Sequence, residues 1–146
     1  MRIVWKNYPL DMHQFAKLAA IAGEAANSQG KFWEFHDKLF ANQSKLALND
    51  LKQYAKEVGL DTAQFEKDLV DPGKKKRVED DVAEAHSLGV TGTPAFFVNG
   101  HFLNGAKPLQ DFAKLINAEL QRLNLPIPPA ATAQAVAPAP AVPDRQ

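Results

Sequence analysis

The sequence contains no cysteine among its 146 residues. The chain therefore forms no disulfide of its own, and it has no thiolate with which to attack one, so its side chains alone cannot perform thiol–disulfide exchange. The absence fits a reducing compartment, and it fits equally well cysteines in a segment outside this sequence. It does not decide the compartment.

The chain also has a formal net charge of zero and no long apolar run. The 17 basic residues balance the 17 acidic ones, which argues against nucleic acid or an anionic membrane surface as the main partner. No run approaches the roughly 18 apolar residues of a membrane-spanning helix, and the first residues do not resemble a signal peptide. With 45% hydrophobic residues, the chain can still build a packed core.

The first half of the chain predicts one strand followed by several helices. Residues 2–8, "RIVWKNY", are β-prone and do not alternate cleanly, which favours a strand covered on both faces. Apolar residues at helical spacing then predict a helix that ends at Gly30, and "KFWEFHDKLF" predicts a second one. Further helices are predicted after Asn49 as N-cap, after Asp61 in a capping box with Gln64, and from Pro72 to about Leu88.

The second half predicts a hairpin, a helix and a tail. Residues 95–98 form a short strand, Asn99-Gly100 is a hairpin turn signal, and Phe102-Leu103 begins the returning strand. Pro108 opens a last helix with an apolar face. From residue 126 to 146 the composition changes to Pro and Ala, which predicts a disordered tail or linker.

Several stretches together resemble the DsbA-like thioredoxin-fold disulfide oxidoreductases. They are "NYPL" after the first strand, the Ala-rich helix, "QGKFWEFHDKLF", "GL" followed by "F..DL", and "LGVTGTPAFFVNG", in that order along residues 2 to about 123. The resemblance implies an α/β fold: an incomplete thioredoxin-like domain over residues 1–125, with a helical insertion at about 11–88 and a mixed sheet of about three remaining strands.

The resemblance also implies a substrate site. In the family, a cis Thr-Pro bond lies against the reactive cysteines and helps to hold the substrate peptide, so Thr93 and Pro94 become the candidate substrate-binding residues. No catalytic residue, cofactor or metal ligand is identified. Cysteine-containing proteins or peptides are the implied partners, and an extracytoplasmic location, in the periplasm or cell envelope, is the implied compartment.

The family's first strand and its Cys-x-x-Cys helix have no counterpart in this sequence, and we expect them upstream of Met1. A central strand missing from a sheet leaves backbone groups without partners at roughly 1–3 kcal/mol each. We therefore expect a chain that is marginally stable alone or that self-associates by strand swapping.

Other patterns receive plainer interpretations. The four histidines lack metal-ligand spacing. Phe32, Trp33 and Phe35 are read as core residues, with an aromatic binding patch as the alternative. "GKKKR" at residues 73–77 is read as a solvated helix face.

Three functions remain open. The chain is part of a DsbA-like oxidoreductase that lacks its redox cysteines and is inactive alone, a non-catalytic peptide-binding or protein-binding module, or a decayed gene remnant.

Overall fold

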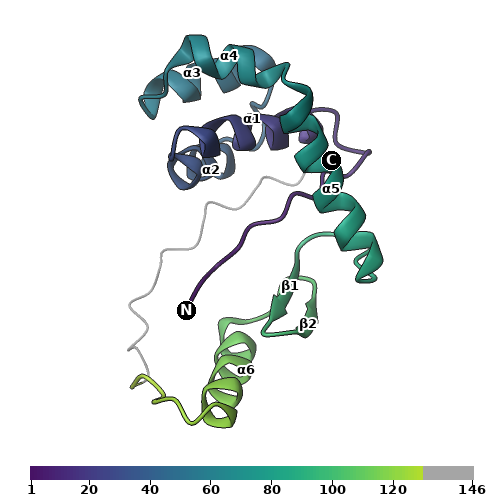
Figure 1. The fold of residues 1–146 in the computed structure, drawn as a ribbon, viewed down its shortest axis with the longest axis vertical. Helices are drawn as coiled ribbons and strands as arrows, with labels where there is room; N and C mark the ends of the chain where they lie inside the picture. Colours follow the sequence, from purple (N-terminus) through teal and green to yellow (C-terminus); the bar gives the residue numbers. More distant parts are fainter. Residues whose placement is uncertain (130–146) are drawn as a thin grey trace, which may run out of the picture. The chain divides into compact units, whose positions relative to one another are not determined.

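The computed structural model describes residues 1–129, and Figure 1 labels its helices and strands. The elements in chain order are α1 (Ala16–Ser28), α2 (Phe32–Ala41), α3 (Leu48–Glu57), α4 (Thr62–Leu69), α5 (Pro72–Ser87), β1 (Ala95–Val98), β2 (His101–Asn104) and α6 (Leu109–Arg122). The chain divides into two compact units, residues 1–95 and the part from residue 96 onward. Most of the predicted Pro/Ala-rich tail lies outside the described residues; residues 126–129 carry neither helix nor strand.

Helix α1 is the central element of the first unit, where it contacts each of α2, α3, α4 and α5. Its alanines at 22, 25 and 26 are fully buried, and small side chains let neighbouring helix axes approach closely. Around them pack the large buried side chains of the other helices. Phe35 of α2 and Phe65 of α4 meet with ring centroids 5.5 Å apart, and each is fully buried. Burying one such side chain stabilises the fold by about 1.5–3 kcal/mol.

The predicted strand at residues 2–8 is wrong. Within residues 1–129 the sheet consists of β1 and β2 alone, so two strands are present where about three were expected. An extended segment becomes a strand only by exchanging backbone hydrogen bonds with a neighbour, and residues 2–8 have none. Ile3 and Val4 remain largely exposed.

One helix start differs from its prediction, and one predicted capping box is only half formed. Helix α3 begins at Leu48 rather than after Asn49, with Ala47 as N-cap, and the Asp50 carboxylate accepts the Ala47 N–H at 3.1 Å. Asp61 does cap α4, since its side chain accepts the Gln64 N–H at 2.9 Å. The reciprocal half of the capping box is missing because the Asp61 N–H donates to Gln29 Oε1 at 2.8 Å instead of to the Gln64 side chain.

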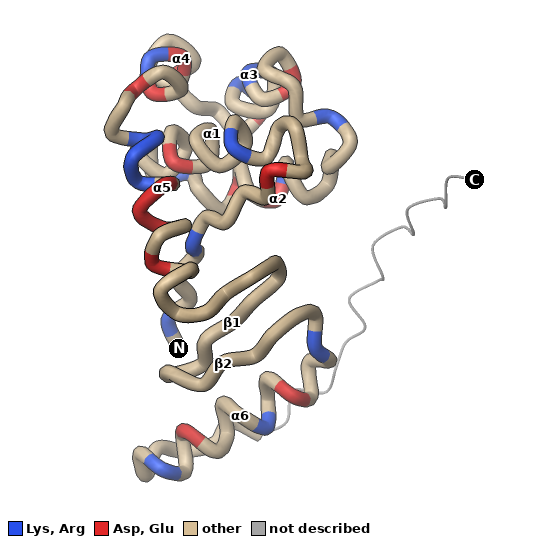
Figure 2. The backbone as a smooth tube through the Cα atoms, turned by 90° about the vertical axis from the view of Figure 1, so that its right-hand side faces the viewer, with Lys and Arg blue, Asp and Glu red and all other residues tan. Residues whose placement is uncertain are grey.

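Acidic residues follow the basic run at the start of α5, as Figure 2 shows along that helix. Lys76 pairs with Asp80 at 2.6 Å, and Arg77 pairs with Glu24 of α1 at 2.8 Å. The basic run is therefore partly neutralised within its own unit.

The second unit holds an antiparallel hairpin, β1–β2, followed by α6. Asn99 and Gly100 both have positive φ, 50° and 90°, as a two-residue type I′ turn requires, so the predicted turn is confirmed. Phe96 of β1 meets Phe112 of α6 edge to face, with ring centroids 4.8 Å apart.

A carboxylate on α6 fastens the hairpin turn. Glu119 is buried and accepts hydrogen bonds from the Arg122 guanidinium, the Asn99 amide and His101 Nε2. These bonds, led by those from Arg122 and then Asn99, lower the pKa of the Glu119 carboxyl to about 2. None of the helices within residues 1–129 is both long and apolar enough to cross a bilayer.

Candidate functional site

The loop that contains Thr93 and Pro94 starts from a fixed helix end. Helix α5 closes with the Val90 N–H donating to the Ala85 carbonyl at 2.9 Å and the Gly89 N–H donating to the His86 carbonyl at 3.0 Å. This pair of bonds is the Schellman motif, which needs a left-handed residue. Gly89 supplies it with φ +76°. The motif sets the direction in which residues 91–94 leave the helix.

The two predicted substrate-binding residues lie together on the surface of this loop. Thr93 and Pro94 are both exposed, and the peptide bond between them is cis. Within residues 1–129, no backbone hydrogen bond involves residues 91–94. Because polar main-chain groups seek partners, the loop offers its free N–H and C=O groups to solvent or to a bound chain.

Tyr8 ties the start of this loop to the N-terminal segment. Its phenolic hydroxyl donates to the Val90 carbonyl oxygen at 3.2 Å, and His86 Nε2 lies 2.9 Å from the same hydroxyl. A carbonyl can only accept, so the Tyr8 hydrogen points to Val90 and His86 Nε2 donates to the phenolic oxygen. The two rings meet edge to face at 5.5 Å.

Asn7, the residue before it, is held by two buried carboxylates. Its main-chain N–H donates to Asp81 Oδ2 at 2.9 Å, and its side-chain amide donates to the same oxygen at 3.0 Å and to Glu24 Oε1 at 2.8 Å. All three residues are less than 10% exposed. The segment thus joins α1 and α5 without forming a strand.

Two cations, Arg77 and Lys6, and one further carboxylate, Glu84, surround this buried group. Arg77 Nε lies 2.8 Å from Glu24, and Lys6 Nζ lies 3.0 Å from Asp81 and 2.7 Å from Glu84. Hydrogen bonds from Lys6 to Glu84 and then to Asp81 raise the pKa of the lysine. Glu24 and Asp81 therefore each accept a hydrogen bond from the Asn7 amide and pair with a cation.

A cavity of about 570 Å³ opens beside the N-terminal segment, between residues 5–16 and helices α1 and α2. Its walls are apolar and aromatic side chains with a few uncharged polar ones; we call it the aromatic cavity. The lining residues are Trp5, Asn7, Tyr8, Pro9, Met12, His13, Gln14, Phe15, Ala16, Ala19, Ala20, Gly23, Phe32, His36, Leu39, Phe40, Gln43 and Leu46.

The aromatic cavity corrects part of the core interpretation of α2. Phe35 is fully buried as expected, but Trp33 is 46% exposed and Phe32 lines the cavity. The aromatic residues at 32, 33 and 35 thus divide between the core and the surface. Their different environments follow from helix geometry, because consecutive residues point in different directions around the axis.

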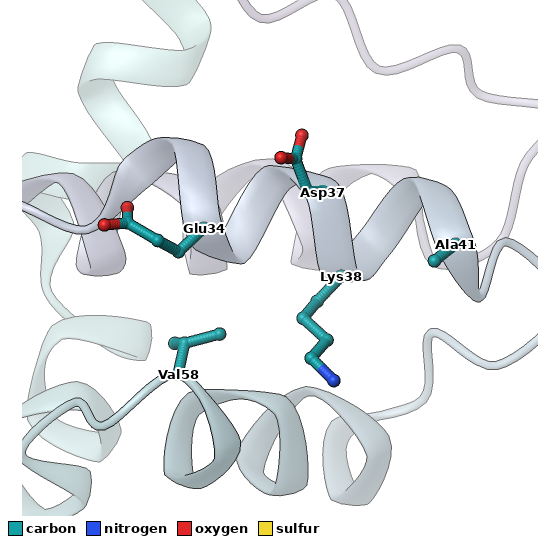
Figure 3. Close-up of a pocket in the computed structure, with 5 residues that line it drawn as sticks. All are labelled: Glu34, Asp37, Lys38, Ala41 and Val58. Atoms are coloured by element: carbon teal, nitrogen blue, oxygen red, sulfur yellow. The ribbon is translucent and has the colours of Figure 1, made fainter. Parts of the chain in front are cut away.

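A second cavity, of about 500 Å³, lies between α2 and the end of α3 and is drawn in Figure 3. It is lined by Glu34, Asp37, Lys38, Ala41 and Val58. Figure 3 shows the Lys38 side chain extending from α2 toward the facing helix, where its ammonium pairs with Glu57 at 2.9 Å. Asp37, also in the lining, lies 3.0 Å from His36 Nδ1.

There is no thiol anywhere in the sequence, and within residues 1–129 no three His, Cys, Asp or Glu side chains are placed to hold a metal ion. The contacts of Tyr8 and Asn7 were missed by sequence reasoning because their partners lie 82 and 74 residues away. One signal was available: Asp81 stands three residues after Val78 on the apolar stripe of α5, where a carboxylate needs a buried partner.

Relatives of the chain include segments of Na⁺/H⁺ antiporters. "Na(+)/H(+) antiporter NhaA 1" of Salinispora arenicola is 40% identical over 119 residues, covering 81% of this chain and 18% of the antiporter. "Na(+)/H(+) antiporter NhaA 3" of Salinispora tropica is 45% identical over 106 residues, covering 72% of this chain and 16% of the antiporter. The chain spans less than a fifth of the length of these curated relatives.

A solved structure with the same fold is that of a thioredoxin-like oxidoreductase from Silicibacter pomeroyi. It aligns with a TM-score of 0.72 and 28% identity, over 80% of this chain and 66% of that one. The family model described as a DSBA-like thioredoxin domain matches residues 2–117, which include the N-terminal segment, all five helices of the first unit and the loop at Thr93. The chain belongs to the DSBA-like thioredoxin domain family.

Proposed function

We propose that this chain is part of a DsbA-like thiol–disulfide oxidoreductase and contributes the surface that docks the substrate polypeptide. The exposed loop at Thr93 and Pro94 holds the substrate, and the reacting thiols come from residues outside this sequence. The observation that carries the proposal is the family match over residues 2–117 in a chain with no cysteine.

The loop has the properties that docking of an extended chain requires. Its main-chain groups at residues 91–94 are without backbone partners in the described part of the chain, and an extended peptide binds by pairing with such groups. The Schellman closure at Gly89 and the hydrogen bond from Tyr8 hold its start. A docking surface held in place loses less entropy on binding than a mobile one.

Thiol–disulfide exchange requires sulfur atoms that this chain does not supply. Exchange proceeds by attack of a thiolate on a disulfide sulfur, which forms one S–S bond as another breaks and releases a new thiolate. This chain holds neither the attacking nor the leaving sulfur. Alone it binds substrate without turnover. Membership of the family supports an extracytoplasmic location.

A non-catalytic binding module is the second candidate, and the complete absence of cysteine favours it. Segments of Na⁺/H⁺ antiporters are 40–45% identical to this chain, so this module could form a peptide-binding part of a longer membrane transporter. The two candidates share the docking loop and differ in whether supplied cysteines create activity.

The test has two parts, both on the 146-residue chain. First, ¹⁵N-labelled chain is titrated with an extended peptide in which serine replaces cysteine, and the amides of Thr91, Gly92 and Thr93 are followed. Docking at the loop shifts these amides, Pro94→Ala weakens the binding, and Pro108→Ala, a proline outside the loop, does not. Absence of any shift at the loop at millimolar peptide contradicts the proposal.

Second, a strand and a helix that begins with Cys-x-x-Cys are fused ahead of Met1, and disulfide reduction is measured. The chain alone gives the uncatalysed rate, and the fusion exceeds it if the chain is part of an oxidoreductase. A fusion in which serines replace both cysteines is the matched control. A folded, peptide-binding fusion with no activity favours the non-catalytic module.

A further inference from the structure

We infer that His86 is a positioning residue for the docking loop at residues 91–94. Its Nε2 atom decides whether the Tyr8 hydroxyl donates to the Val90 carbonyl. The inference rests on the proposed function and adds regulation to it: docking is tighter when the His86 ring is protonated than when the ring is neutral. Three features support it: the single hydrogen of the Tyr8 hydroxyl, the burial of the Val90 carbonyl and the surroundings of the His86 ring.

The Tyr8 hydroxyl has one hydrogen and two neighbours that can accept it. The Val90 carbonyl oxygen lies 3.2 Å away, and His86 Nε2 lies 2.9 Å away. An imidazole nitrogen donates when it carries a hydrogen and accepts when it does not. Two arrangements therefore share the same heavy-atom positions. With a hydrogen on His86 Nε2, Tyr8 donates to Val90. Without one, Tyr8 donates to His86 and the Val90 carbonyl loses its partner.

The distances favour the nitrogen as acceptor whenever it is free to accept. The 3.2 Å between Tyr8 and the Val90 oxygen exceeds the usual range of about 2.5–3.0 Å for an O–H···O bond. His86 is exposed, so water can serve Nδ1 of the ring in either tautomer. The neutral ring therefore draws the Tyr8 hydrogen away from Val90. Protonation places a hydrogen on both ring nitrogens and excludes that arrangement.

Loss of the Tyr8 bond affects the residue that leads into the docking loop. Val90 is 6% exposed, and Tyr8 is the only donor to its carbonyl in the part of the chain that the structure describes. A buried carbonyl without a partner is unfavourable, so its peptide group is expected to move toward solvent. The start of the loop then becomes less well held, and more entropy is lost when a peptide docks there.

The His86 ring is free to titrate without a fixed ion pair. The histidines that pair with carboxylates within residues 1–129 are His36 and His101. The contacts of His86 are instead the hydrogen bond and the edge-to-face packing with Tyr8. The charged groups that join the N-terminal segment and α1 to α5 are in ion pairs with one another. These pairs are Lys6 with Asp81 and Glu84, Lys17 with Glu79, and Arg77 with Glu24.

The test compares the 146-residue chain at pH about 5 and about 8, on either side of the usual titration range of imidazole. The chain, labelled with ¹³C and ¹⁵N, is titrated with an extended peptide of uncharged residues that has serine in place of cysteine. At the higher pH we expect His86 Nε2 to lack its hydrogen and the Val90 carbonyl carbon to shift. Peptide binding, followed at the amides of Thr91 and Thr93, should be at least about threefold weaker there.

His86→Phe distinguishes positioning through Tyr8 from simple support of the loop. Phenylalanine keeps a ring beside Tyr8 but has no nitrogen, so the Tyr8 hydrogen stays on Val90 and binding should be tight at both pH values. Tyr8→Phe removes the donor and should bind weakly at both. His13→Phe, at another exposed histidine, is the matched control and should keep the pH dependence of the unaltered chain.

The outcomes separate the inference from the proposed function. Equal peptide binding at the two pH values, with shifts at the loop, overturns the inference and leaves the docking function standing. Weak binding of His86→Phe at both pH values also overturns it, because His86 would then only support the loop. No shift at the loop at either pH contradicts docking and overturns the inference with it. If His86→Phe fails to fold, the unaltered chain decides: a Val90 carbonyl signal that does not follow the titration of the His86 ring overturns the inference.

Discussion

The hydroxyl of Tyr8 donates to the main-chain carbonyl oxygen of Val90 at 3.2 Å, which links the N-terminal segment to the residue whose N–H closes α5. This hydrogen bond fixes the residue that precedes the proposed docking loop. His86 Nε2 lies 2.9 Å from the same Tyr8 hydroxyl. The bond to Val90 makes the position of residues 91–94 depend on a residue from the opposite end of the first unit.

Tyr8→Phe should destabilise the chain by about 1 kcal/mol and loosen the loop, because the Val90 carbonyl loses its partner. Stability is measured by urea unfolding, and the loop by hydrogen exchange of the Thr91 and Thr93 amides. Tyr54→Phe is the matched control, since Tyr54 also donates to a main-chain carbonyl, that of Lys45 at 3.0 Å. It should reduce stability by a similar amount without faster loop exchange. Equal loop exchange in the two variants would show that Tyr8 does not hold the loop.

Asp81→Ala should reduce the free energy of unfolding by about 2 kcal/mol, because the buried Asn7 main-chain N–H loses its acceptor and the Asn7 side-chain amide keeps only its bond to Glu24. Asp80→Ala, on the exposed side of the same helix, removes only a surface pair with Lys76 and should cost less than about 0.5 kcal/mol. Thermal unfolding compares the two. Proteolysis near residues 1–8 should accelerate in Asp81→Ala alone. Similar stabilities for both variants would argue against the anchoring role of Asp81.

Acid should open the contact between the hairpin turn and α6 only at very low pH. The pKa of Glu119 is lowered from 4.5 to about 2 by its hydrogen bonds. A carboxylate with a lowered pKa in the folded state contributes stability above its unfolded value, and that contribution is lost as pH falls toward the folded value. The amides of Asn99 and His101 should therefore stay unchanged near pH 4.5 and change as the pH falls through about 2. Glu119→Gln should abolish this transition, and a midpoint near 4.5 in the unaltered chain would contradict the strength of the contact.

Gly89→Ala should destabilise the chain by about 1–2 kcal/mol, since a left-handed conformation is unfavourable for a residue with a Cβ. The effect is conformational, because a Cβ at this position meets no atom within 4 Å. Gly92→Ala, where φ is not positive and the space is also open, should change stability by less than about 0.5 kcal/mol. Equal losses in both variants would contradict the assignment of the cost to the positive φ of Gly89.

The elements that the sequence predicted well are those specified by a few neighbouring residues. Gly89 after an apolar stripe marked the end of α5, and Asn99-Gly100 marked the hairpin, because each needs only a local backbone conformation. The strand at residues 2–8 could not be predicted correctly in the same way. Its β-propensity is real, but a strand also needs a neighbour, which no local pattern supplies.

The candidate site likewise contains residues that the sequence identified and contacts that it could not predict. Thr93 and Pro94 were identified by resemblance, and the structure places them on one exposed loop. The hydrogen bonds of Asn7 to Glu24 and Asp81 join residues far apart in sequence. Helical periodicity could therefore indicate that a carboxylate is buried, but it could not predict which residue binds it. The aromatic cavity likewise depends on how the N-terminal segment passes α1 and α2, which no spacing rule gives.

The contact between Asn99 and Glu119 has a consequence for chemical ageing. Asparagine before glycine is prone to lose its side-chain amide, since Gly100 has no side chain to shield its main-chain nitrogen as that atom attacks the amide carbon. The product is an acid, and at this position it faces Glu119 where an amide had donated a hydrogen bond. An attractive contact becomes a repulsion between two carboxylates. Intact-mass analysis of stored protein, followed by NMR of the hairpin, would reveal the change, and aged molecules should be those in which the turn has separated from α6.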